Sequence, residues 1–115
     1  MLSPDMYWLA FALAAVLCGT AAQFGASRDS ALRLLLAWIG PAILLAALGY
    51  LDWSAETVKE TPLGTYLVSA ILTPLVAVAT AWLLRRRARR SIQWSAAVAA
   101  SFFTELGVLV ATFFF

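Results

Sequence analysis

Residues 64–84 read GTYLVSAILTPLVAVATAWLL and carry no charged side chain, and residues 85–90 follow directly as RRRARR. An α-helix needs about 20 mainly apolar residues to cross the hydrocarbon core of a bilayer. Three more apolar stretches of similar length occupy residues 6–24, 34–51 and 92–115. The sequence therefore predicts four transmembrane helices joined by short polar connectors.

The composition supports the same class of protein. Of the 115 residues, 63% are hydrophobic and only 12% are charged, whereas about a quarter of the residues in a soluble domain are charged. A water-soluble chain of this size has too little interior to hide so much apolar surface. Because the connectors are short, we expect residues 1–115 to form a single all-α domain, a four-helix bundle that lies wholly in the bilayer.

The basic residues are divided unequally between the connectors. Seven of the eight are Arg in the first and third connectors, and the eighth, Lys59, lies in the second. Short loops rich in Lys and Arg stay on the cytoplasmic side of a membrane. We therefore predict cytoplasmic first and third connectors, with the second connector and both termini on the outer side. This pattern is typical of a multi-pass protein of a prokaryotic inner (cytoplasmic) membrane.

The third connector holds a basic run with two interpretations. It is a lipid-facing anchor that fixes the topology, or it binds an anionic lipid or an acidic partner. One short loop offers no element that reads a nucleic-acid groove, so the lipid bilayer, and not a nucleic acid, is an expected partner. The run consists of Arg85, Arg86, Arg87, Arg89 and Arg90.

Local signals predict where the helices start and which side chains mark the membrane surface. Ser, Thr and Asp cap helix N-termini, and Pro is favoured at the first helical position. The expected starts are Ser3-Pro4, Asp29 or Ser30, Thr61-Pro62 and Ser91. Trp prefers the membrane–water interface. The Trp residues expected near the inner helix ends are Trp38, Trp82 and Trp94.

Small and polar side chains recur at the three- to four-residue spacing that keeps them on one side of a helix. Membrane helices associate through such residues, so these faces are expected to pack inside the bundle. They are Ala15, Gly19, Ala22 and Gln23; Ala42, Ala46 and Gly49; Thr65, Ser69, Thr73, Ala77 and Thr80; and Gln93, Ala97, Ser101, Glu105 and Thr112.

Glu105 stands near the middle of the last apolar stretch, with no Lys or Arg near it in the sequence. It lies about 16 Å beyond Trp94 along a helix, close to the bilayer centre. An ionised carboxylate at that depth costs roughly 2.5–3.5 kcal/mol, and such residues are functional-site candidates by default. Three interpretations stay open: a proton- or cation-binding group, a docking group for another membrane subunit, and a protonated structural residue.

A break in the third predicted helix falls at a similar depth. Pro74 cannot donate a backbone hydrogen bond, and it frees the carbonyl of Ala70. This carbonyl and the neighbouring hydroxyl groups would form a small polar pocket near the midplane. The residues predicted for this site are Glu105, Ser101, Thr73, Ser69 and Pro74.

The remaining composition excludes several kinds of chemistry. The chain has no His and a single Cys, Cys18, which excludes an intrachain disulfide and a Cys/His zinc site. It contains no Ser-His-Asp set, phosphate-cradling Gly loop or carboxylate pair. We therefore expect no cofactor, no metal and no enzymatic activity, and we interpret Cys18 as a small packing residue.

These observations favour a small oligomeric transporter or channel for a proton, an ion or a small solute, with Glu105 as its ionisable group. Four short helices leave little room for a pathway within one subunit, which favours a homo-oligomer. The alternative is a non-catalytic accessory or assembly subunit that binds other membrane subunits. A holin-like pore is a third possibility.

Overall fold

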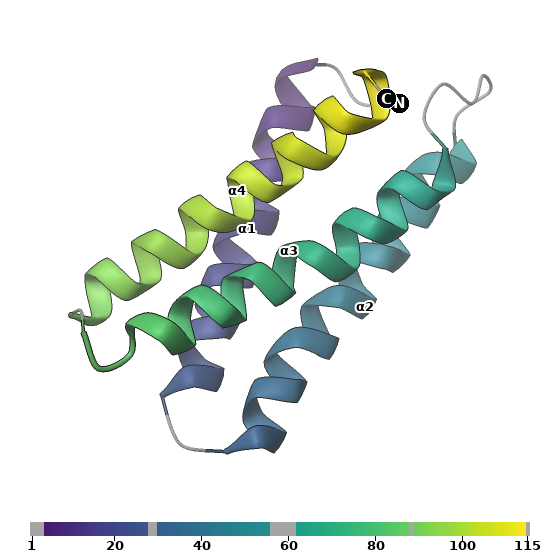
Figure 1. The fold of residues 1–115 in the computed structure, drawn as a ribbon. Coiled ribbons are helices and arrows are strands. Elements are labelled where there is room, and N and C mark those ends of the chain that lie inside the picture. The colour runs from purple at the N-terminus through teal and green to yellow at the C-terminus, as the bar shows by residue number, and fades with distance from the viewer. Residues whose placement is uncertain (1–3, 28–29, 56–61, 88, 115) are drawn as a thin grey trace.

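The computed structural model describes residues 4–27, 30–55, 62–87 and 89–114. They form four α-helices: α1 (Pro4–Ala26), α2 (Ala31–Ala55), α3 (Leu63–Leu84) and α4 (Arg90–Phe114) (Figure 1). Each helix contains a stretch that is long and apolar enough to cross a membrane. The helices extend past the predicted apolar limits by up to four residues, because backbone hydrogen bonding continues into the polar flanks.

The helices alternate in direction along an elongated bundle of 47 × 24 × 23 Å. The turn from α1 to α2 and the turn from α3 to α4 lie at one end, while α1 begins and α4 ends at the other (Figure 1). Both α1 and α3 contact all the other helices, whereas α2 and α4 do not contact each other within the described residues. Thus α1 and α3 form the middle of the bundle, and α2 and α4 flank it.

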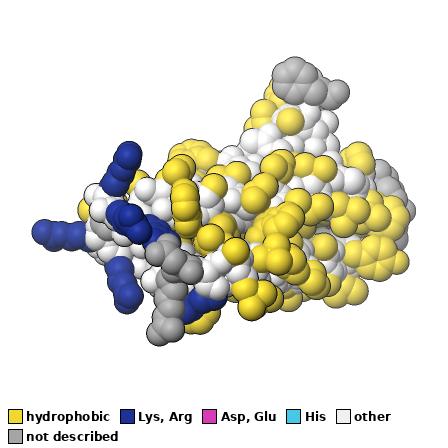
Figure 2. Space-filling model, turned by 60° about the horizontal axis from the view of Figure 1, so that its bottom comes forward, with side chains coloured by type: hydrophobic (Ala, Val, Ile, Leu, Met, Phe, Trp, Pro, Cys, Tyr) yellow, Lys and Arg dark blue, Asp and Glu magenta, His cyan; other side chains and the backbone are white. Residues whose placement is uncertain are grey.

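The described arginines gather at one end of the molecule, which we call the Arg end (Figure 2). This arrangement follows from the sequence, since both Arg-bearing connectors join the helices at the same end. Large apolar side chains cover much of the helix surfaces, with Leu9, Leu36 and Ile43 each about 60% exposed. The outside of the bundle is therefore apolar along its length and basic at one end.

The observed first residues of the helices show that the capping prediction is only partly right. The backbone N–H of Arg33 donates to Ser30 Oγ at 3.4 Å, so Ser30 caps α2. Pro62 is the N-cap of α3 and not its first residue, since its backbone is extended. The prediction for Ser91 is wrong, because Gln93 N–H already bonds to the Arg89 carbonyl and Ser91 lies inside α4. The other predicted caps, Ser3, Asp29 and Thr61, lie outside the described residues.

The interior is built of small side chains rather than large ones. The buried hydrophobic cluster contains six Ala residues, Cys18 and Val78, with Leu34, Trp38 and Leu45 packed against it. Among the described residues, the predicted face supplies all four buried positions on α4 and three of the six on α1, but only Thr73 and Ala77 of the six on α3. On α2 the prediction holds for Gly49, which packs against Tyr66 of α3, but Ala37 and Pro41 are buried there while Ala42 and Ala46 are only half-buried.

Three glycines let helix backbones approach closely. A Cβ atom at Gly19 would collide with Val98 of α4, lying 3.0 Å from its backbone nitrogen. A Cβ atom at Gly25 would likewise collide with Ala37 of α2, and one at Gly49 would collide with Tyr66 of α3. Close backbone approach at small residues is the usual means by which membrane helices associate, and here it joins α1 to α4, α1 to α2 and α2 to α3.

Gly19→Ala is expected to lower the free energy of unfolding by about 1–3 kcal/mol, because the added methyl group must displace the α4 backbone at Val98. The matched control is Gly107→Ala, since nothing lies within 4 Å of a Cβ at Gly107. That variant is expected to be neutral or more stable by up to about 1 kcal/mol, from helix propensity. Titration with a denaturing detergent, followed by circular dichroism, measures both. Equal midpoints for the two variants would contradict the close contact of α1 with α4.

Candidate functional site

Glu105 lies inside the bundle. Its side chain is only 5% exposed although it is an acid in the middle of an apolar helix. Ser101, one turn before it on α4, is fully buried, as is Ala97 one turn earlier. The predicted polar face of α4 therefore points inward, toward α1 and α3, and Glu105 does not project from the surface of the protomer.

Two hydrogen bonds fix how α3 lies along α4. At the Arg end, Gln93 Nε2 donates to the carbonyl oxygen of Ala81 at 2.6 Å. Toward the other end, Thr65 Oγ1 and Thr112 Oγ1 lie 3.0 Å apart. Since these bonds involve opposite ends of both helices, the antiparallel register of α3 and α4 is set along their whole contact.

This register decides what lies at the level of Glu105. Interpolating between the two bonds, Glu105 falls opposite a position near Ile71 of α3. Thr73, Pro74 and Ala70 are then all within one helical turn of that level, because a turn rises about 5.4 Å. The predicted coincidence in depth between Glu105 and the Pro74 break is therefore present in the fold.

Two polar atoms at this level have no hydrogen-bond partner among the described residues: Thr73 Oγ1 and Glu105 Oε2. The Thr73 side chain is fully buried. Other helical hydroxyl groups bond back to the carbonyl four residues earlier, as Ser101 does to Ala97 at 2.8 Å and Thr80 does to Val76 at 2.8 Å. Buried polar groups are nearly always paired, so two unpaired atoms at one depth mark this region as unusual.

The residues around these two atoms differ in part from those predicted to form the pocket. Ser101 is buried, but its hydroxyl group is already used by the Ala97 carbonyl. Ser69 lies one turn from Thr73 and is half-buried, which leaves it at the margin. Pro74 is fully buried beside Thr73. Of the five predicted residues, Glu105 of α4 and Thr73 of α3 hold the unpaired atoms, and Pro74 follows Thr73 directly on α3.

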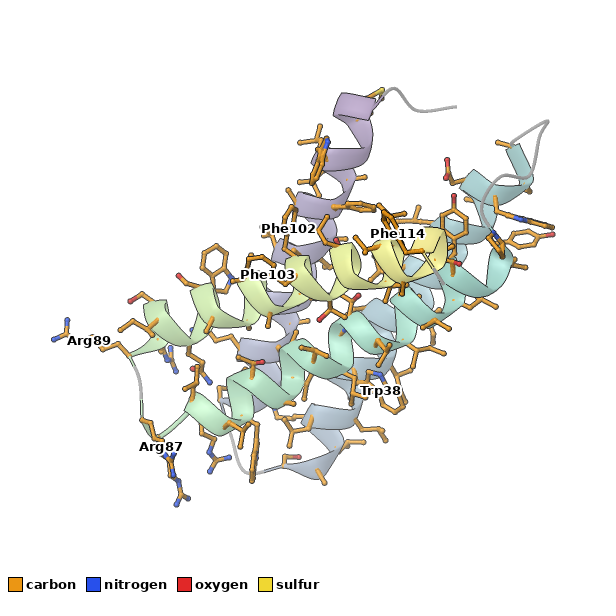
Figure 3. All side chains as sticks on the ribbon, turned by 45° about the horizontal axis from the view of Figure 1, so that its top comes forward. Trp38, Arg87, Arg89, Phe102, Phe103 and Phe114 are labelled. Atoms are coloured by element: carbon orange, nitrogen blue, oxygen red, sulfur yellow. The ribbon has the colours of Figure 1, made fainter. Side chains whose placement is uncertain are left out.

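Two contacts near the site could not be found from sequence spacing. Cys18 of α1 is fully buried and close enough to Glu105 for an electrostatic interaction. Trp38 Nε1 of α2 donates to the carbonyl oxygen of Ile71 at 3.0 Å (Figure 3). Trp38 was expected near the inner end of its helix, but its ring lies against the middle of α3, beside the carbonyl that follows the one freed by Pro74.

The Arg end is held by side chains that bond to helix termini. Arg85 N–H bonds to the Trp82 carbonyl in a tighter turn, so the Ala81 carbonyl has Gln93 as its partner. Gln23 Nε2 of α1 donates to the Arg90 carbonyl at 2.9 Å. In addition, Trp94 Nε1 donates to Thr20 Oγ1 at 3.0 Å. The predicted basic run extends beyond this layer, and Arg87 and Arg89 point away from the bundle (Figure 3).

The possible ligands at the site are few. Among the described residues, no group of three His, Cys, Asp or Glu side chains is arranged to hold a metal ion. The oxygen atoms at the level of Glu105 are its own carboxylate, the Thr73 hydroxyl and the backbone carbonyl of Ala70, which Pro74 leaves without its helical donor. Such a set suits a proton or a weakly held monovalent cation better than a transition metal.

Comparison with known proteins adds no assignment. No protein-family model matches the chain, and no curated protein or solved structure matches it either.

Gln93→Leu is expected to lower the free energy of unfolding by about 1–3 kcal/mol, because the buried Ala81 carbonyl would lose its partner. The matched control is Gln23→Leu, since the bond from Gln23 to the Arg90 carbonyl is exposed and water can replace it. That control is expected to change stability by less than about 0.5 kcal/mol. Detergent-induced unfolding measures both. A larger loss in the Gln23 variant would contradict the role assigned to Gln93.

Proposed function

We propose that this chain is a small membrane transport or channel protein that binds a proton or a monovalent cation at Glu105. The observation that carries the proposal is the pair of unpaired buried atoms, Glu105 Oε2 and Thr73 Oγ1, at one depth in an apolar bundle. A purely structural acid would be expected to use its hydrogen-bonding capacity on its neighbours. A binding group leaves that capacity for its ligand.

The burial of Glu105 favours this proposal over docking to another subunit. A docking acid must reach the surface of the protomer, whereas Glu105 is 5% exposed and lies among α1, α3 and α4. An ionised carboxylate in such a place is costly unless it is neutralised. With no basic side chain at this depth among the described residues, a proton or a cation is the simplest neutralising partner.

Pro74 supplies a point at which the site can open. The proline removes one backbone bond from α3 and loosens the turn that carries Thr73. Trp38 Nε1 bonds to the Ile71 carbonyl across this turn and ties it to α2. We infer that α3 bends at Pro74 between two positions, and that Glu105 is exposed to a different side of the membrane in each. The bond from Trp38 to the Ile71 carbonyl is present in one of these two positions.

The membrane arrangement belongs to the same proposal. We infer that the helices span a bilayer with the Arg end in the cytoplasm, because seven of the eight basic residues lie in the two connectors and adjoining helix ends of that end. Small side chains pack closely around Cys18 and Ala97 in the interior of the described bundle. We therefore infer that several copies assemble, and that the pathway past Glu105 is completed by movement or by a second copy.

Glu105→Gln is expected to abolish pH- or cation-dependent flux in proteoliposomes, with a loss of at least about tenfold, because the amide neither releases a proton nor neutralises a cation. The variant keeps the size of the side chain, so circular dichroism and gel filtration should match the parent. The matched control is Asp52→Asn. Asp52 accepts a hydrogen bond from the Tyr66 hydroxyl at 2.9 Å at the far end of the bundle, and its loss should leave flux within about twofold.

Two outcomes would count against this function. Unchanged flux in a folded Glu105→Gln variant would remove Glu105 from transport. A chain that is monomeric in mild detergent and co-purifies with other membrane proteins would favour the accessory-subunit alternative. Gel filtration with light scattering separates these cases, because a self-assembled oligomer has a mass that is a multiple of 12.4 kDa after the detergent is subtracted.

The proposed orientation is tested by single cysteines in a Cys18→Ala background, since Cys18 is buried and small. An impermeant thiol reagent added to intact cells is expected to label Glu56→Cys and to leave Arg87→Cys unlabelled. After the membrane is permeabilised, both should react. Labelling of Arg87→Cys in intact cells would reverse the assignment of the two ends.

A further inference from the structure

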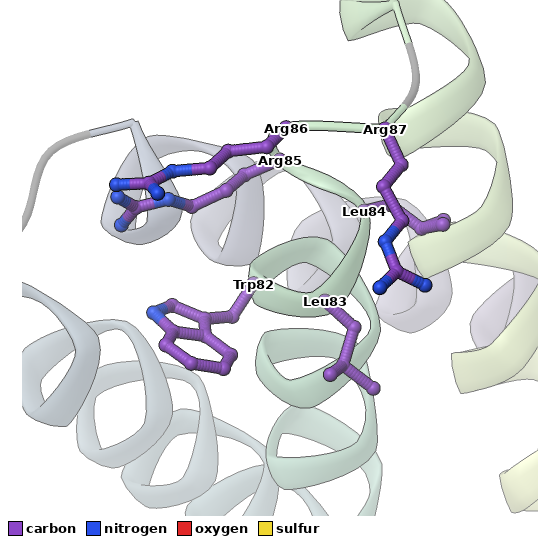
Figure 4. A pocket seen from close by; sticks show the side chains of 6 residues that line it. All are labelled: Trp82, Leu83, Leu84, Arg85, Arg86 and Arg87. Carbon is purple, nitrogen blue, oxygen red and sulfur yellow. The ribbon is translucent and has the colours of Figure 1, made fainter.

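An open pocket of about 460 Å³ lies at the C-terminal end of α3 (Figure 4). It is independent of Glu105 and opens at the surface of the Arg end. Its lining combines apolar and basic residues that follow one another in the sequence: Trp82, Leu83, Leu84, Arg85, Arg86 and Arg87. The short apolar-to-basic transition of the sequence thus becomes a single two-part surface.

The side chains in this pocket are arranged in an ordered way. Arg85 and Arg86 run side by side in the same direction, and the indole ring of Trp82 lies below them (Figure 4). Arg87 points to the other side of the helix end, next to Leu83 (Figure 4). Two guanidinium groups held in parallel repel each other, and an anion placed between them relieves that repulsion. Arginine forks match the oxygen atoms of a phosphate group especially well.

The charge balance at this end leaves positive charge available. The two connectors and adjoining helix ends of the Arg end carry seven Arg and one acid, Asp29. The C-terminus of α3 adds the equivalent of roughly half a negative charge. Arg85 and Arg86 also take part in other interactions. At the Arg end the C-termini of α1 and α3 are balanced by the N-termini of α2 and α4 (Figure 1). One Asp cannot neutralise seven guanidinium groups, so a further anion is favoured.

The apolar half of the pocket points to a lipid rather than to a free anion. The Trp82 side chain is 48% exposed and lies below Arg85 and Arg86, whereas Leu83 is 64% exposed and lies below Arg87 on the other side of the helix end (Figure 4). Trp prefers the level of lipid headgroups, with its ring toward the acyl chains. A free phosphate would use only the basic edge, whereas a phospholipid would fill both halves of the pocket.

We propose that this pocket binds the headgroup of one anionic phospholipid, with its phosphate between Arg85 and Arg86 and an acyl chain along Trp82. The site goes beyond a topology anchor, because it selects a lipid at one position and does not merely attract a charged surface. It requires that the chain lie in a bilayer, but it does not depend on transport at Glu105.

The test measures lipid retention by native mass spectrometry of the full chain released from nanodiscs of phosphatidylcholine doped with phosphatidylglycerol. The parent chain is expected to keep one phosphatidylglycerol per subunit in preference to phosphatidylcholine. Arg85→Gln/Arg86→Gln is expected to weaken that binding roughly ten- to thirtyfold, from the loss of two basic contacts near the membrane surface. The matched control, Arg89→Gln/Arg90→Gln, removes the same charge away from the pocket and should lose no more than about threefold.

Further arms separate the alternatives. Arg85→Lys/Arg86→Lys keeps the charge and, if it folds like the parent, should still lose several-fold because the paired forks are gone. Equal weakening by both Gln pairs would reduce the site to diffuse electrostatic attraction and overturn the proposal. Displacement of phosphatidylglycerol by millimolar inorganic phosphate would assign the pocket to a free anion instead. Lipid retention and displacement by phosphate both measure binding and not transport. Their results therefore hold whether or not Glu105→Gln alters flux.

Discussion

Close approach of helix backbones at small residues is the condition on which the rest of this fold depends. Gly19, Gly25 and Gly49 bring α1, α2, α3 and α4 together in pairs, and alanines fill the space between them. Large side chains are directed outward, where they cover the surface. Because the interior is built of small side chains, the Glu105 carboxylate and the Thr73 and Ser101 hydroxyl groups are enclosed within it.

The sequence was sufficient for the number of helices, their approximate limits and the inward face of α4, and in part for the inward faces of α1 and α3. Apolar length and the spacing of small residues depend on local order along one helix, so they can be read directly. It was not sufficient for α2, where Ala37 and Pro41 are buried in place of Ala42 and Ala46. The face that a helix buries depends on its rotation against its neighbours, and in α2 small residues occur on more than one side.

The candidate site shows more clearly that contacts between separate helices could not be predicted from the sequence. Glu105 and Pro74 were identifiable because an acid and a proline are exceptional in an apolar helix. Their common depth followed from the short connector between α3 and α4. The contribution of Cys18 and the bond from Trp38 to the Ile71 carbonyl depend on the crossing of separate helices. Ser101 was a reasonable candidate by spacing, yet its hydroxyl group is used within its own helix.

The position of Glu105 on the final helix also bears on how the protein is made. Its neighbours Cys18 and Thr73 belong to α1 and α3, which leave the ribosome before α4. In the proposed membrane arrangement, α4 would therefore enter against helices that are already in place, and Glu105 would meet Cys18 of α1. This order of synthesis would favour the insertion of α4, the least hydrophobic of the four helices.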